Sequence, residues 1–267
     1  MTTKVLVHHH IFKNAGSTVD FSLEKIFKSD FRILDGVPFD EIYKILTENK
    51  SIKAISSHHF HSHQFVLEGF EFLDIIFLRH PLDRFRSIYD FYKRAEQIDD
   101  PLAKIAQLMQ PSDFFGYLVE YFPNQINNAQ VNILANNGNY SKPPSINDYN
   151  KAIVKIENIA LPGVVDWFDE SIVTAEYFLR PCLGVLDWSY IVQNKTSGTA
   201  DTIETRLDNF REECGSKLYN HLVAVNELDI SLYEYAKTEL LRRINYVPNF
   251  ERKLADFKIK CLQMGGG

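Results

Sequence analysis

The sequence predicts an α/β fold with a central parallel sheet, because apolar strand-like runs alternate with helix-like patterns. The clearest buried strand is 72–78, which is apolar throughout except for Asp74. Pro81 follows it and marks the start of a helix that we expect to reach about Ala95. A second apolar run, 4–11, leads into a turn of small residues and another helical pattern. This alternation favours a parallel sheet covered on both faces.

The other elements are expected on the same grounds, taken in chain order. Strands are expected where short apolar runs occur, at 4–11, 31–34, 52–56, 72–78 and 159–165. Helices are expected where apolar residues recur at helical spacing, at 17–27, 39–46, 81–95, 168–179 and 228–244, the last a long terminal helix. Ser17 or Thr18 is expected near the N-cap of the first helix. We expect 102–131 to form a helical insertion and 136–144 a mobile surface loop.

Length and composition indicate one domain with a sizeable core. The chain has 267 residues, 45% of them hydrophobic, and no Pro/Gly/Ser-rich linker divides it. We therefore expect a single domain over residues 1–267. The formal net charge of −6 argues against a surface that binds nucleic acid, which is usually basic. An anionic ligand would need a local basic pocket.

Cysteine usage and hydropathy predict a reducing, cytoplasmic location. The three cysteines, Cys182, Cys214 and Cys261, are widely spaced and form no C-x-x-C pair, which disfavours a disulfide framework and a structural zinc site. No stretch reaches the eighteen or more apolar residues of a membrane span, and the first residues do not resemble a signal peptide. We expect neither a membrane span nor an anchor.

The segment Lys13-Asn-Ala-Gly-Ser-Thr18 is the most informative motif, because it joins a strand-like run to a helix-like pattern. The backbone N–H groups of such a turn and the positive end of the helix dipole favour a phosphate at one place. Lys13, Ser17 and Thr18 add a cation and two hydroxyl donors. A turn with an ordinary helix cap is the simpler alternative. The segment is not a Walker A motif, since Lys13 precedes Gly16 and no glycine takes the early position.

A second polar segment, 78–89, begins at the end of the strongest strand. Ligands of open α/β sheets bind beyond the carboxyl ends of strands, so Arg79 is expected to reach the same crevice as Lys13. Ser87 lies eight positions further, about two helical turns on, where its hydroxyl can share an anion with a guanidinium. Arg84 and Arg86 are expected to face solvent or to pair with nearby aspartates, Asp83 and Asp90.

Two histidine-rich stretches, 8–10 and 58–63, contain seven of the nine histidines. Side chains alternate along a strand, so His8 and His10 can share one face while His9 points away. A metal is one interpretation, but neither a nearby cysteine nor an H-E-x-x-H pattern completes a site, and we expect none. Packing or helix capping is the alternative for His8 and His9.

These segments together resemble the sulfotransferases that use 3′-phosphoadenosine-5′-phosphosulfate (PAPS), and most closely the carbohydrate branch that includes the heparan sulfate 2-O-sulfotransferases. His10-Ile-Phe-Lys-Asn-Ala-Gly-Ser-Thr18 is similar to the family's His-Ile-Pro-Lys-Thr-Ala-Gly-Thr-Thr loop, with Phe12 for proline and Asn14 for threonine. Residues 79–89 are similar to a family segment Arg-x-Pro-x-x-Arg-Phe-x-Ser-x-Tyr. The resemblance extends more weakly to 163–171, 194–196 and 226–233.

The resemblance implies a three-layer P-loop-kinase-like fold and a role for each matched residue. The loop residues Lys13, Asn14, Ala15, Gly16, Ser17 and Thr18 would hold the 5′-phosphosulfate, and Arg79 and Ser87 would hold the 3′-phosphate. Lys13 would also stabilise the charge on the departing phosphate oxygen. The histidine after the third strand would be the general base, with His58 the nearest match and His59 and His61 as rivals.

The expected function is therefore transfer of a sulfuryl group from PAPS to an acceptor hydroxyl, with 3′-phosphoadenosine-5′-phosphate (PAP) as product and no metal. The resemblance implies a glycan acceptor. One alternative is a nucleotide-dependent phosphotransferase, which would need a Walker A lysine that this sequence lacks. Another is a binding module without catalytic activity, which the presence of Lys13 and the histidine cluster disfavours.

Overall fold

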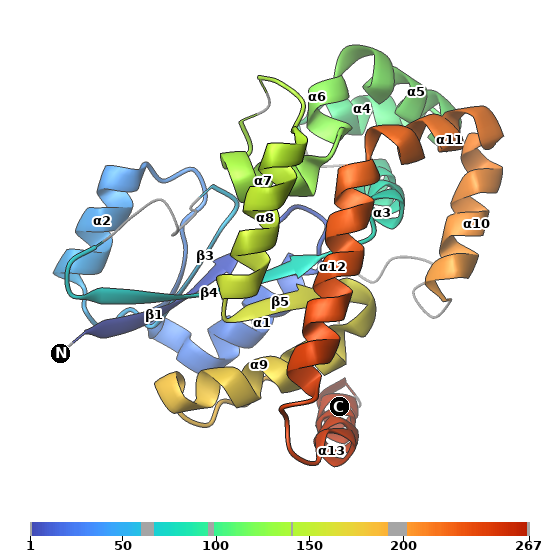
Figure 1. Cartoon of the computed structure of the whole chain (residues 1–267). Coiled ribbons are helices and arrows are strands. Elements are labelled where there is room, and N and C mark those ends of the chain that lie inside the picture. Colours follow the sequence, from blue (N-terminus) through green and yellow to red (C-terminus); the bar gives the residue numbers. More distant parts are fainter. Residues whose placement is uncertain (1, 60–66, 96–98, 140, 192–201, 266–267) are drawn as a thin grey trace. The chain divides into compact units, whose positions relative to one another are not determined.

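The computed structural model describes residues 2–59, 67–95, 99–139, 141–191 and 202–265 (Figure 1). These residues belong to two compact units, which are described separately. The first unit comprises Met1–Leu78, Val154–Asn194 and Tyr235–Gly267, and the second comprises Arg79–Ile153 and Lys195–Glu234.

The first unit contains a five-stranded sheet in which every pairing is parallel (Figure 1). Its strands are β1 (Thr3–His9), β2 (Phe31–Ile33), β3 (Ala54–Ser57), β4 (Phe70–Leu78) and β5 (Leu161–Val164). Their order is β2-β3-β1-β4-β5, so β1 is the central strand. The expected α/β class and parallel sheet are confirmed. Because the strands are parallel, the chain segments that follow β1 and β3 leave the sheet at the same edge.

Helices cover both faces of this sheet, and β1 shows why. Its side chains alternate between the two faces, so Leu6 joins one apolar cluster while Val5 and Val7 join another. The Leu6 cluster contains residues of α1 (Gly16–Phe27), α9 (Phe168–Leu183) and α13 (Phe250–Gly265). The Val5 cluster contains residues of α2 (Phe39–Glu48). The first unit is thus consistent with a three-layer α/β arrangement.

The second unit is helical and has its own aromatic core. It contains α3 (Pro81–Arg94), α4 (Pro101–Leu108), α5 (Pro111–Tyr121), α6 (Pro123–Ile126), α7 (Ala129–Asn136), α10 (Ile203–Cys214) and α11 (Ser216–Val225). Phe115 lies 5.8 Å from Phe85 and 5.2 Å from Phe210 between ring centroids, and all three are buried. The expected helical stretch 102–131 is confirmed as several short helices, of which α4, α5 and α6 begin with proline, as α3 does.

Two long helices have residues in both units, α8 (Ile146–Asn158) and α12 (Glu227–Ile244). We did not predict α8. We predicted α12 as a terminal helix, which is wrong, because the shorter α13 follows it. None of the helices in the described ranges has the length and apolar character needed to cross a lipid bilayer.

Candidate functional site

The loop between β1 and α1 has an unusual backbone. Lys13 and Ala15 both have positive φ, at 66° and 61°, which costs a residue with a side chain about 1–2 kcal/mol. The helix begins at Gly16, with Ala15 at its N-cap and no capping side chain. Ser17 therefore lies near the N-cap, as expected, but the N-cap residue itself is Ala15. A strained turn followed by a helix start without a capping side chain is a backbone arrangement that suits an anion.

Asn14 fixes this loop to the neighbouring strand. Its side-chain amide donates a hydrogen bond of 2.8 Å to the carbonyl of Phe77, in β4, and Asn14 is buried. The amide of Asn14 therefore anchors the loop to β4. The shorter side chain of a threonine could not make the same contact. Of the other predicted loop ligands, Ser17 is exposed and Thr18 is buried. The ammonium of Lys13 lies 5.9 Å from the centroid of the Phe12 ring.

Gly16 leaves room for the ring of His10. A Cβ atom at position 16 would lie 2.0 Å from both Cδ2 and Nε2 of His10, far inside van der Waals contact. The φ angle of Gly16 is not positive, so its backbone conformation does not require glycine. Position 16 requires glycine because the His10 ring leaves no space for a side chain. His10 therefore lies directly against the start of α1.

We expect Gly16→Ala to destabilise the protein by about 1–3 kcal/mol, because the new methyl group must displace the His10 ring. Gly116 is the matched control, since it also lies in a helix but a Cβ atom added there would have no neighbour within 4 Å. Gly116→Ala should instead stabilise by about 0.5–1 kcal/mol. Urea unfolding measures both. His10→Ala should relieve most of the cost of Gly16→Ala, and simple additivity of the two changes would contradict this account.

His58 and His59 follow β3 at the edge where the loop lies. His58 is partly buried, and its ring centroid lies 4.0 Å from that of His10. Burial lowers the pKa of His58, and the charge of His10 lowers it further, although Asp35 and a hydrogen bond with the His10 backbone oppose the shift. His59 is exposed, and its Nδ1 accepts a 3.4 Å hydrogen bond from the backbone of Gly36. His61 lies outside the described residues.

His8 and His10 lie on the same face of β1, as their spacing predicts, and both contact Asp20 of α1. The Nδ1 atoms of His8 and His10 lie 2.8 and 2.9 Å from separate oxygens of the Asp20 carboxylate. Sequence reasoning missed Asp20, although it lies one turn into the helix that follows the loop. Burial raises the pKa of Asp20, but the hydrogen bonds from His10 and His8 outweigh this and hold it well below its ordinary value.

His8, His10 and Asp20 are a group that a metal ion could use as ligands, with ligand atoms within 4.8 Å of one another. The observed contacts of 2.8 and 2.9 Å are ordinary lengths for N–H···O hydrogen bonds. Ligands bound tetrahedrally at about 2.0–2.1 Å from zinc would lie about 3.3 Å apart. Protons therefore account for this geometry better than a metal ion does.

His9 points to the other face of β1. Its Nε2 lies 2.8 Å from a carboxylate oxygen of Asp74 in β4, and burial lowers the pKa of His9 despite this bond. His9 is buried, and the pair lies near Lys155, whose pKa burial lowers to about 8. His8 and His9 are thus buried histidines hydrogen-bonded to partly buried aspartates, which is close to the packing interpretation.

In the second unit, Arg79 is buried and bound on several sides. Its Nε donates a hydrogen bond of 2.6 Å to Asp83, and its backbone exchanges hydrogen bonds of 3.1 and 2.8 Å with the side chain of Gln130. Asp83 also accepts a hydrogen bond of 2.9 Å from Arg206, at the start of α10. Two guanidinium groups thus share one carboxylate. Sequence reasoning missed Arg206, because no local pattern connects it to Arg79.

The neighbouring residues on α3 meet the expectations only in part. Ser87 is buried, two turns after the start of the helix. Arg86 pairs with Asp90 at 3.1 Å, as expected, and also contacts Glu213. Arg84 is buried, which contradicts the first of its two expected states, exposure to solvent; the other, pairing with Asp83 or Asp90, stays a prediction. Asp83 pairs with Arg79 and Arg206 and not with Arg86. The segment 194–196 of the weaker resemblance lies outside the described residues.

Fold and candidate site define an α/β protein whose central strand leads into a strained, lysine-containing loop and a helix N-terminus. A protein of Archaeoglobus fulgidus, described as uncharacterized, is 30% identical to this chain over 249 residues, covering 88% of this chain and 96% of the relative. The chain belongs to the same family as this archaeal protein. No family model matches the chain.

Proposed function

We propose that the protein is a sulfotransferase that uses PAPS, with a P-loop-kinase-like arrangement of its sheet and helices. The observation that carries the proposal is the loop from His10 to Ala15 between the central strand and α1. Its two left-handed residues, its anchor to β4 and the helix start at Gly16 support an anion-binding function. The loop of the first unit would hold the 5′-phosphosulfate.

The sequence resemblance supports the assignment of Arg79 and Ser87 to the 3′-phosphate. Within the second unit, the guanidinium groups of Arg79 and Arg206 both donate to Asp83. A phosphate bound there would find two guanidinium groups already oriented by a buried carboxylate. We therefore add Arg206 to the residues proposed to bind this group.

The proposed reaction moves a sulfuryl group in line between two oxygens. A bond forms between the acceptor oxygen and sulfur, and the bond from sulfur to the bridging phosphate oxygen breaks. The electron pair of that bond remains on the phosphate of PAP, where the ammonium of Lys13 stabilises it. The proton of the acceptor hydroxyl passes to an imidazole, which we assign to His58, with His59 and His61 as the alternatives. A sugar hydroxyl of a glycan is the proposed acceptor.

Ligand-induced thermal stabilisation tests the donor class. We expect PAP to raise the melting temperature much more than ATP with Mg²⁺ at the same concentration, because the proposed site lacks the Walker A lysine. Equal shifts, or a larger shift with ATP and Mg²⁺, would favour a nucleotide-dependent phosphotransferase. A transfer assay with labelled PAPS against a panel of glycans then tests the acceptor. PAP binding without transfer to any hydroxyl would favour a binding module.

A further inference from the structure

The ring of His10 is held in place from two sides within the first unit. Asp20 binds its Nδ1 at 2.9 Å, and the Cδ2–Nε2 edge lies against Gly16, where a Cβ atom would be 2.0 Å away. The second oxygen of the Asp20 carboxylate is bound by His8, which is itself 2.9 Å from the hydroxyl of Ser56. The two imidazoles thus hold the Asp20 carboxylate in one orientation, and the carboxylate holds the rings of His8 and His10 in theirs.

His10 in turn supports His58. The two ring centroids are 4.0 Å apart with an interplanar angle of 37°, and the backbone of His10 is hydrogen-bonded to His58. In the neutral imidazole one ring nitrogen is an acceptor. This is the form that a general base requires.

Within the ranges that the structure describes, the titratable and charged groups near His58 are those of His10, Asp35, His59 and Lys13. His10, which directly follows β1, lies beside it, and Asp35, after β2, has a carboxylate oxygen 3.9 Å from its Nε2. His59 is next to it, at 6.4 Å between ring centroids. On the loop side the ring of Phe12, which carries the Lys13 ammonium on its face, is 6.5 Å away. A proton on the imidazole of His10 opposes a second proton on His58.

We propose that Asp20 and His10 are positioning residues for His58, holding its imidazole in one orientation and keeping it uncharged so that it can take up the acceptor's proton. The catalytic role of His58 rests on the proposed function. The contacts that join Asp20, His10 and His58 belong to the first unit whatever reaction the protein catalyses. Asp20 acts through His10, and neither residue needs to touch a substrate.

His10→Phe is the informative variant, because it keeps an aromatic ring against His58 and Gly16 but removes the titrating nitrogen atoms. NMR titration of the histidine rings measures the pKa of His58 directly. In the native protein we expect this pKa below 6.5, the ordinary value for histidine, and in His10→Phe we expect it to rise. An unchanged pKa of His58 in His10→Phe would overturn the proposal whether or not the protein transfers sulfuryl groups.

Kinetics provide the second readout. We expect His10→Phe and Asp20→Asn each to lower kcat by about tenfold near neutral pH, since a small misplacement of a catalytic group is costly. In His10→Phe the acid limb of kcat should also move to higher pH. PAP affinity should stay close to native in both variants. Asp20→Asn should lower the melting temperature, since it removes a carboxylate that two imidazoles bind, so the kinetics are measured well below the melting temperature of each variant. A change of packing alone would lower kcat without moving the acid limb, and that result would overturn the proposal.

His221→Gln is the matched control, because His221 is an exposed histidine of the second unit. It should leave the pKa of His58 and the pH profile unchanged. Failure of the proposed function is recognised separately, as a native protein that neither binds PAP nor transfers a sulfuryl group. The NMR titration still decides in that case whether His10 controls the charge of His58.

Discussion

Lys13→Ala is expected to slow sulfuryl transfer by about 10²–10³-fold, which is the usual cost of losing one donor at a developing oxyanion. The ammonium is the cation of the strained loop, and the charge on the departing phosphate oxygen grows only as the reaction proceeds. The loss should therefore fall mainly on kcat and less on the affinity for PAP. Single-turnover kinetics and PAP titration measure the two separately.

Lys28→Ala is the matched control for this substitution. Lys28 also has a positive φ, of 49°, and it lies at the other end of α1 from Lys13. Both changes replace a lysine at a residue with positive φ and keep a β-carbon there. Lys28→Ala should transfer at the native rate. If Lys13→Ala retains a rate within about threefold of native, the loop has no part in charge stabilisation and the proposed mechanism fails.

The fold could be predicted from sequence wherever a local period decides the outcome. The apolar run 72–78 became β4, and Pro81 begins α3 as expected, since both signals act within a few residues. Alternation along β1 also placed His8 and His10 on one face. The partner of these histidines could not be predicted, because it depends on which side of α1 faces the strand, and no local pattern of the sequence determines this.

The loop shows where local rules fail. Capping preferences favour Ser17 or Thr18 at the N-cap, yet α1 begins one residue after a left-handed Ala15. The long-range bond from Asn14 to the carbonyl of Phe77 helps to fix the path of the chain there, and a propensity argument cannot include it. Arg206 is a similar case, since it reaches Asp83 across 123 positions of sequence. Sequence identified Lys13, Arg79 and the turn, whereas Arg206 and the partners of these residues could be found only from the tertiary structure.

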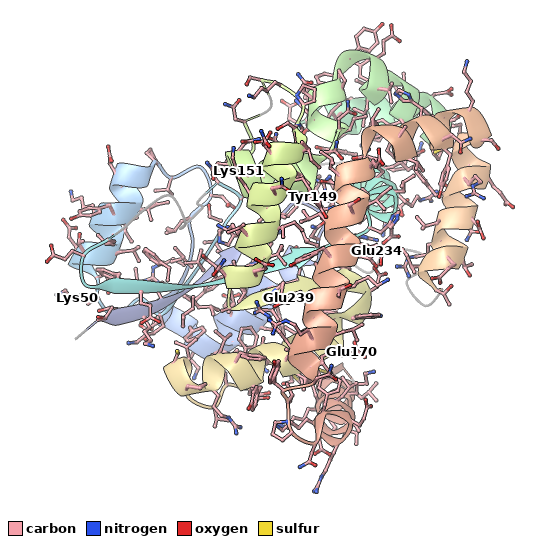
Figure 2. All side chains as sticks on the ribbon, viewed as in Figure 1. Lys50, Tyr149, Lys151, Glu170, Glu234 and Glu239 are labelled. Atoms are coloured by element: carbon pink, nitrogen blue, oxygen red, sulfur yellow. The ribbon has the colours of Figure 1, made fainter. Side chains whose placement is uncertain are left out.

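Arg243→Ala is expected to destabilise the first unit by about 3–5 kcal/mol, the cost of breaking a buried, multiply bonded ion pair. The guanidinium donates hydrogen bonds to four backbone carbonyls around the end of α8 and the start of β5, those of Ile156, Glu157, Ile159 and Ala160, at 2.8 to 3.3 Å. Its Nε donates to Glu239, which lies one turn earlier on α12 (Figure 2). Urea unfolding measures the free energy change.

Arg242→Ala is the matched control for Arg243→Ala, because Arg242 binds the same carboxylate, that of Glu239, from the adjacent position. Its Nε lies 2.7 Å from Glu239, as does that of Arg243, but its side chain is 58% exposed whereas that of Arg243 is 8% exposed. Exposed pairs contribute at most about 1 kcal/mol, so Arg242→Ala should be nearly neutral. Arg243→Lys should recover only part of the loss, since an ammonium cannot reach four carbonyls with a planar fork of donors. Equal costs for Arg242→Ala and Arg243→Ala would mean that the shared carboxylate, and not the bonds to the four carbonyls, determines the stability of this region.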